Sequence, residues 1–184
     1  MEKYIALLRG VNVGGKNKIS MSELKLAFEE IGFLDVITYI NSGNVIFSSN
    51  TQDKSELIRK SESIIEDKFK LSIPVTVISA KELSDVLNNA PVWWNTEDKE
   101  IYDNAIFVIP PTSVEEVFAE VGNAKPEYEK VDSYGNVIFW SASLKTFNKT
   151  RWSKTASSSV NKNVTIRNAN TTKKLLELTE KVNM

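Results

Sequence analysis

Apolar positions in the first half of the chain follow two different periods. The short run KYIALLR at 3–9 is typical of a buried strand. Ser20 with Glu23 forms an S-x-x-E capping box, and the apolar residues that follow recur at helical spacing as far as Gly32. The other elements predicted here are strands over 36–40, 44–47 and 74–78, a hairpin turn at 41–43, a helix with an apolar stripe from Leu57 to Phe69, and a short helix over 80–88.

The second half of the chain predicts the same order of elements. Its clearest feature is GNVIF, which stands at 43–47 and again at 135–139, 92 residues later in a chain of 184. In both places Gly and Asn form the hairpin turn, where a positive φ is tolerated. We predict strands over 104–109, 128–131, 136–140 and 164–167, and helices over 113–121, 144–157 and 171–182.

This repeat predicts an α+β fold built by internal duplication. We expect two tandem ferredoxin-like βαββαβ units, each followed by an extra helix. The expected ranges are 1–92 for the first unit, 93–103 for a connecting segment and 104–184 for the second unit. A turn followed by a core strand is enough to explain the five repeated residues themselves. Chance recurrence is the alternative to an internal duplication.

Composition excludes several kinds of chemistry. The chain has no Cys and no His, so disulfides, Cys nucleophiles, Ser-His-Asp triads and the usual zinc sites are absent. We expect no cofactor and no metal site, since a metal would need oxygen ligands alone. The chain also lacks an apolar run of about 18 residues and a signal peptide, so we expect a cytoplasmic protein without a membrane partner.

The charge is unevenly distributed along the chain. The net charge is −1, yet residues 133–176 contain no Asp or Glu and carry a formal charge of +8, which leaves −9 for the remainder. Such a division favours a face that binds anions. The alternatives are that the two parts of the chain attract each other, or that the lysines are solvated helix faces.

A glycine-rich segment between the first strand and first helix is the first candidate site. GVNVGGKN at 10–17 fits G-x-x-x-x-G-K, but Asn17 stands where a P-loop needs Ser or Thr, and the hairpins indicate an antiparallel sheet. The glycines expose backbone N–H groups among Arg9, Lys16 and Lys18, which suits an anion nest. The alternative is an ordinary flexible loop.

The second candidate site is Arg167-Asn168 at the end of a predicted strand. The helix that follows is expected to open near Asn170 or Thr171, and free N–H groups beside an arginine suit a phosphate or a carboxylate. Simple capping of the helix by Asn170 or Thr171 is the alternative.

The third candidate is the basic stretch KTRWSK at 149–154. Lys149 and Arg151 next to Trp152 are typical of nucleic-acid surfaces, where cations hold phosphate and aromatic rings stack on bases. Phe147 and Trp140 are nearby, although we favour a place in the core for both.

The chain contains, in this order, the motifs ALLRGVNVGGKNKISMSEL, TYINSGNVIF and TIRNANTTKKLLEL. Together they resemble the bacterial family catalogued as domain of unknown function 1697. The resemblance covers nearly the whole chain and implies a two-lobed α/β protein with no established activity. It implies an aromatic residue where this chain has Ala169. It also implies a binding role for the motif residues that lie in loops and at element ends: Arg9, Gly10, Asn12, Gly14, Gly15, Lys16, Ser42, Asn44, Arg167, Asn168 and Thr171.

Our leading hypothesis is a binding module for a phosphate-bearing ligand, either a nucleotide or nucleic acid. The Gly10–Lys18 loop, Arg167 and the helix after Asn168 would line its site. One alternative is an enzyme acting on a nucleotide or phosphoester, with Lys16 and Arg167 stabilising charge. Another is a protein-interaction scaffold.

Overall fold

The computed structural model describes residues 1–181, and the chain forms two compact units. Unit 1 consists of Met1–Ser84 together with the segment that begins at Lys174, and unit 2 consists of Asp85–Lys173. Unit 1 is therefore discontinuous in sequence, unlike the continuous ranges 1–92 and 104–184 expected above. Those ranges as domains, with a connecting segment at 93–103, remain a prediction.

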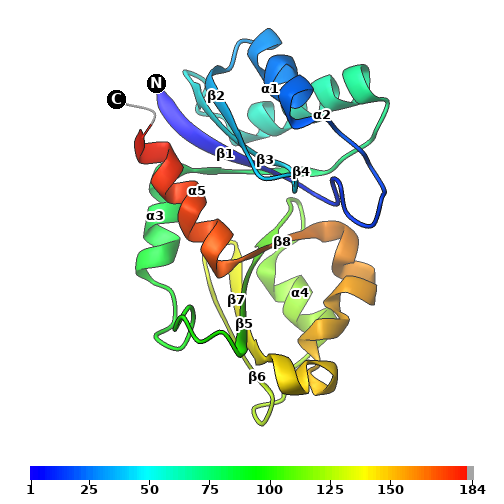
Figure 1. The fold of residues 1–184 in the computed structure, drawn as a ribbon, viewed down its shortest axis with the longest axis vertical. Coiled ribbons are helices and arrows are strands. Elements are labelled where there is room, and N and C mark those ends of the chain that lie inside the picture. The colour runs from blue at the N-terminus through cyan, green and yellow to red at the C-terminus, as the bar shows by residue number, and fades with distance from the viewer. Residues whose placement is uncertain (182–184) are drawn as a thin grey trace. The chain divides into compact units, whose positions relative to one another are not determined.

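Unit 1 is built on a four-stranded antiparallel sheet with the spatial order β2-β3-β1-β4. Figure 1 shows α1 and α2 on the same face of this sheet. The apolar stripes of both helices meet that face in one core. The elements are β1 (Glu2–Leu8), α1 (Met21–Glu30), β2 (Leu34–Tyr39), β3 (Asn44–Ser49), α2 (Lys54–Phe69), β4 (Val75–Ser79) and the start of α3 (Ala80–Asn88), whose residues from Asp85 belong to unit 2.

Unit 2 is built on a second four-stranded antiparallel sheet, with the order β6-β7-β5-β8. Three short 3₁₀ helices stand between β7 and β8. The elements are β5 (Ile101–Val108), α4 (Val114–Val121), β6 (Glu129–Tyr134), β7 (Val137–Ser143), η1 (Leu144–Lys149), η2 (Trp152–Ser157), η3 (Ser159–Asn163), β8 (Val164–Asn168) and the start of α5 (Ala169–Lys181), whose residues from Lys174 belong to unit 1. The α+β class predicted from sequence is confirmed.

The helix predicted over 144–157 is wrong, because η1 and η2 take its place. The buried carboxylate of Glu129 accepts the backbone N–H groups of Arg151 and Trp152 at 2.8 and 3.1 Å, so these N–H groups do not enter an α-helical ladder. Hydroxyl groups also bond carbonyls three residues back, as Ser153 does with Thr150 and Ser158 does with Thr155. Such local bonds compete with α-helix formation.

The cap of α1 is simpler than its sequence pattern indicates. The Ser20 hydroxyl accepts the N–H of Glu23, as an N-cap should. The capping box, which also needs the Glu23 carboxylate on the Ser20 N–H, is formed instead at α4, between Ser113 and Glu116.

The two GNVIF segments face opposite ways in their sheets. In β3, Val45 and Phe47 point into the core under the helices. In β7 the residues that enter the equivalent core are Ile138 and Trp140, whereas Phe139 lies on the other face with its ring 4.9 Å from that of Trp94. A shift of one residue exchanges the two faces of a strand. The repeated letters therefore occupy non-equivalent positions.

None of the helices in residues 1–181 combines the length and the apolar character needed to cross a bilayer.

Candidate functional site

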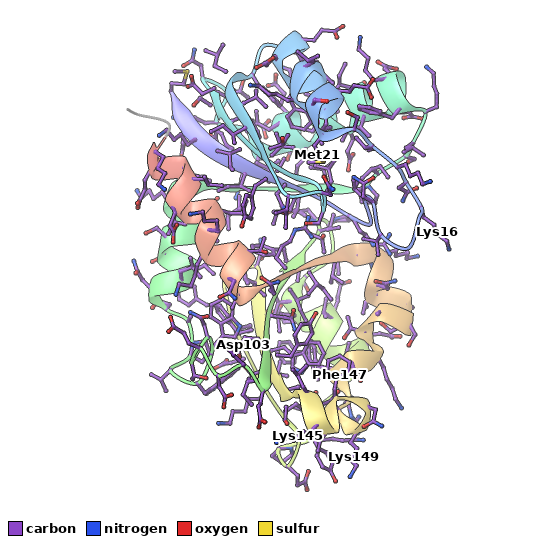
Figure 2. All side chains as sticks on the ribbon, viewed as in Figure 1. Lys16, Met21, Asp103, Lys145, Phe147 and Lys149 are labelled. Carbon is purple, nitrogen blue, oxygen red and sulfur yellow. The ribbon has the colours of Figure 1, made fainter. Side chains whose placement is uncertain are left out.

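The glycine-rich segment after β1 folds into a small hairpin of its own. The Asn12 N–H donates to the Asn17 carbonyl at 3.1 Å, and the Lys16 N–H donates to the Val13 carbonyl at 3.0 Å. Gly14 and Gly15 have φ of +56° and +76°, as a type I′ turn needs at its two central residues. The tip of the hairpin therefore presents glycine backbone and the exposed Lys16, while α1 begins only at Met21 (Figure 2).

Asn12 fixes the base of this hairpin. Its Nδ2 donates to the carbonyls of Ile19 and Asn41, each at 2.9 Å, and its Oδ1 accepts the Ile19 N–H at 2.9 Å. Its backbone is left-handed, with φ of +55°. Asn tolerates this conformation better than most residues, which explains why an asparagine suits the position. Asn12 therefore positions the loop and joins it to the turn after β2.

A hollow of about 480 Å³ lies between the hairpin and the start of α1. One lysine and no acidic residue line it, and the N-terminus of α1 borders it. A helix N-terminus carries partial positive charge and free N–H groups. The lining residues are Asn12, Gly15, Lys18, Ile19, Ser20, Met21 and Asn41.

Two of the predicted site residues close the hairpin between β2 and β3. The Asn44 side chain is fully buried, and its Nδ2 donates to the Tyr39 carbonyl and the Ser42 hydroxyl, each at 3.0 Å. These contacts give Ser42 and Asn44 a structural role in the turn. Their neighbour Asn41, which the sequence did not single out, is the residue of this turn that borders the hollow.

The Arg167-Asn168 segment is arranged differently from its prediction. The Asn168 Oδ1 accepts the Thr171 N–H at 2.7 Å, so Asn168 caps α5, in place of Asn170 or Thr171. Arg167 is buried, and its Nη1 donates to the Thr165 hydroxyl at 2.8 Å and to the Ile166 carbonyl at 2.9 Å. Burial lowers the pKa of Arg167 to about 10, so the guanidinium is still charged at neutral pH.

The basic stretch at 149–154 exposes its cations but not its tryptophan. The Lys149 Nζ lies 5.6 Å from the centre of the Tyr128 ring, and the Arg151 side chain is exposed. Trp152 is fully buried, with its ring 5.0 Å from Phe118 and its Nε1 bonded to the Gly122 carbonyl. The hypothesis that Trp152 stacks on bases is therefore wrong. The favoured place of Trp140 and Phe147 is confirmed, since both pack in or against the core.

The predicted site residues divide between the units. The structure brings the hairpin, Lys18 and the β2–β3 turn together within unit 1, and it places Arg167 next to the cap of α5 within unit 2. A single site shared by both sets remains a prediction. Unit 1 contains Arg9, Asn12, Gly14, Gly15, Lys16, Ser42 and Asn44, and unit 2 contains Lys149, Arg151, Arg167, Asn168 and Thr171.

Comparisons with known proteins agree with the first two motifs, which lie within the residues matched by a family model. A family model described as "Protein of unknown function (DUF1697)" matches residues 1–139. The solved structure of a conserved bacterial protein from Streptococcus pneumoniae is similar to this chain, with 30% sequence identity and a TM-score of 0.86. That similarity covers 96% of this chain and 98% of the other. None of the curated proteins is a significant match.

Proposed function

Because the chain belongs to DUF1697, a family of proteins of unknown function, we propose a function from its own residues: it binds a phosphate-bearing ligand at the glycine-rich hairpin. The observation behind this proposal is the hollow beside α1. It is lined by Lys18 and by no acidic residue, and it meets the positive end of a helix.

Three features of this arrangement favour the binding of a phosphate group. The N–H groups of Met21 and Ser22 belong to the first turn of α1, where the helix itself provides no acceptors. The Gly14 and Gly15 N–H groups form no hydrogen bond within residues 1–181. Lys18 adds a full positive charge, and charge-assisted hydrogen bonds to phosphate are about twice as strong as neutral ones.

A nucleotide or a nucleic acid would extend beyond this hollow. We include Lys16 at the hairpin tip as a further contact in unit 1. In unit 2, the exposed Lys149 and Arg151 are proposed as separate contacts for phosphate groups. Arg167 and the α5 cap at Asn168 stay in the proposal as a second anion-binding element. Its support is the excess of positive charge over residues 133–176, where no Asp or Glu occurs.

The test is a binding titration at low salt with pyrophosphate, ATP and short single- and double-stranded oligonucleotides. We expect one of these probes to bind, and Lys18→Gln to weaken it about tenfold, the loss of one charge-assisted contact worth roughly 1.4 kcal/mol. Lys81→Gln removes the same charge from an exposed site on α3 and serves as the matched control.

Two results would overturn the proposal. One is the absence of binding across all the probes at millimolar concentration. The other is equal affinity in the parent protein, in Lys18→Gln and in a Lys16→Gln/Lys18→Gln double variant, which would place any bound anion away from the hairpin.

We also propose that the two units are ferredoxin-like βαββαβ units derived from one ancestral copy. The support is the shared strand order, since β2-β3-β1-β4 and β6-β7-β5-β8 place corresponding strands in the same positions. The one-residue shift between the GNVIF segments then means that the true correspondence pairs Val45 with Ile138 and Phe47 with Trp140, both core-facing pairs.

A further inference from the structure

Unit 2 contains a second hollow, of opposite charge, at the start of β5. Its volume is about 320 Å³, near the lower end of the range for small-molecule sites. Asp103, which is labelled in Figure 2, is one of its lining residues. The lining residues are Asn95, Glu97, Asp98, Lys99, Ile101, Tyr102, Asp103, Leu144, Asn168, Ala169 and Asn170.

The acidic rim of this hollow, formed by residues 95–99, is held in place by hydrogen bonds. The buried Trp94 precedes the rim, and its Nε1 donates to the Asn104 carbonyl of β5 at 2.8 Å. Within the rim, the Asp98 Oδ1 accepts the Glu100 N–H at 2.9 Å, and the Asp98 carbonyl accepts the Ile101 N–H at 3.1 Å. The rim is therefore ordered before any ligand arrives.

Asp103 is the lining residue whose carboxylate is best placed to accept a hydrogen bond from a ligand. It is only 8% exposed, and its Oδ1 accepts a hydrogen bond from the buried Ser141 hydroxyl. Its Oδ2 accepts none from residues 1–181. This oxygen is therefore available to accept a charge-assisted hydrogen bond from a donor that enters the hollow.

The charge of the lining selects the class of donor. Three acidic residues and a single lysine line the hollow, together with three asparagines, of which Asn168 already uses its Oδ1 to cap α5. No group of three or more acidic side chains in residues 1–181 converges closely enough to hold a metal ion. The lining therefore favours an organic cation with N–H donors over a metal ion.

We propose that this hollow binds a small organic cation, an ammonium or guanidinium compound whose N–H groups donate to Asp103 Oδ2 and to the rim carboxylates. The site is distinct from the hairpin hollow of the phosphate proposal, which lies in unit 1 and has no acidic lining residue, although Asn168 also belongs to the second anion-binding element proposed above. Its failure and the failure of the phosphate proposal are therefore separately measurable.

The experiment is a calorimetric titration of the full chain with agmatine, which carries one ammonium and one guanidinium group. We expect a dissociation constant below about 1 mM, and a loss of at least tenfold in Asp103→Asn, because one buried charge-assisted hydrogen bond is removed. Asn170→Lys, at an exposed lining position, tests the same site without altering a buried residue and is expected to cause a similar loss.

The controls separate this site from general attraction to negative charge. Glu115→Gln removes one exposed carboxylate from α4 of the same unit and should leave the agmatine affinity unchanged. Lys18→Gln should also leave it unchanged. Equal binding in Asp103→Asn, Asn170→Lys and the parent protein would overturn the proposal, as would no binding of agmatine. Displacement of agmatine by Mg²⁺ at equal concentration would assign the site to a metal ion instead.

Discussion

The glycine in each GNVIF segment adopts a left-handed backbone, with φ of +74° at Gly43 and +56° at Gly135. Their surroundings differ. A Cβ on Gly43 would lie 2.8 Å from the Leu8 Cβ and 3.2 Å from the Val11 Cβ, whereas a Cβ on Gly135 would meet nothing within 4 Å. The first glycine is needed for conformation and for space, and the second for conformation alone.

Alanine at the two positions should therefore have unequal effects. We expect Gly43→Ala to lower the free energy of unfolding by about 3 kcal/mol, since it adds a clash with the root of the Leu8 side chain to the cost of a left-handed backbone. Gly135→Ala is the matched control and should cost about 1 kcal/mol. Urea denaturation of both variants measures the difference, and equal losses would contradict this account of Gly43.

At the scale of elements, the segment between β7 and β8 depends on one buried side chain. Glu129 is 3% exposed and accepts four N–H groups. Its Oε1 takes the backbone N–H groups of Lys125 and Arg151, and its Oε2 takes that of Trp152 and the indole Nε1 of Trp140. The carboxylate thus joins β7, the start of β6 and η2.

Glu129→Gln should weaken this junction. A glutamine keeps one acceptor oxygen and turns an NH₂ group toward two of the four donors, so we expect a loss of about 2–4 kcal/mol in the free energy of unfolding. Faster amide hydrogen exchange at Arg151 and Trp152 would locate the effect.

The exposed Glu127→Gln is the matched control for this loss, expected within about 0.5 kcal/mol of the parent protein. If Glu129→Gln were equally neutral, the carboxylate would not be the group that holds η2.

At the scale of the molecule, the first unit uses residues from both ends of the chain. The Lys3 ammonium donates to the Thr179 carbonyl, and the segment that begins at Lys174 belongs to unit 1. Within that segment Leu175 and Thr179 are 1% and 2% exposed. The stability of unit 1 thus depends on a segment that lies more than 80 residues further along the chain than its other elements.

Leu175→Ala is the corresponding prediction. Removal of a fully buried leucine side chain should cost about 2–4 kcal/mol, and hydrogen-exchange protection should fall in the strands of unit 1. Leu26→Ala, at a position 63% exposed on α1, should cost less than about 0.5 kcal/mol. Unchanged protection of β1 in Leu175→Ala would show that the end of α5 does not stabilise unit 1.

The local pattern of the sequence was enough to place nearly all of the helices and strands, because apolar periodicity and turn residues act over a few neighbours. It also located the glycine-rich segment and Lys18 beside it, although not the hairpin that this segment forms or the capping of α5 by Asn168. Only the tertiary structure decided which face of each strand is buried. A one-residue change of register exchanges the two faces of a strand without any change in its amino-acid sequence. The solvation of a long side chain likewise depends on what packs over it. Arg167 and Trp152 are buried for that reason, Asn41 reaches the first hollow, and Asp103 lines the second.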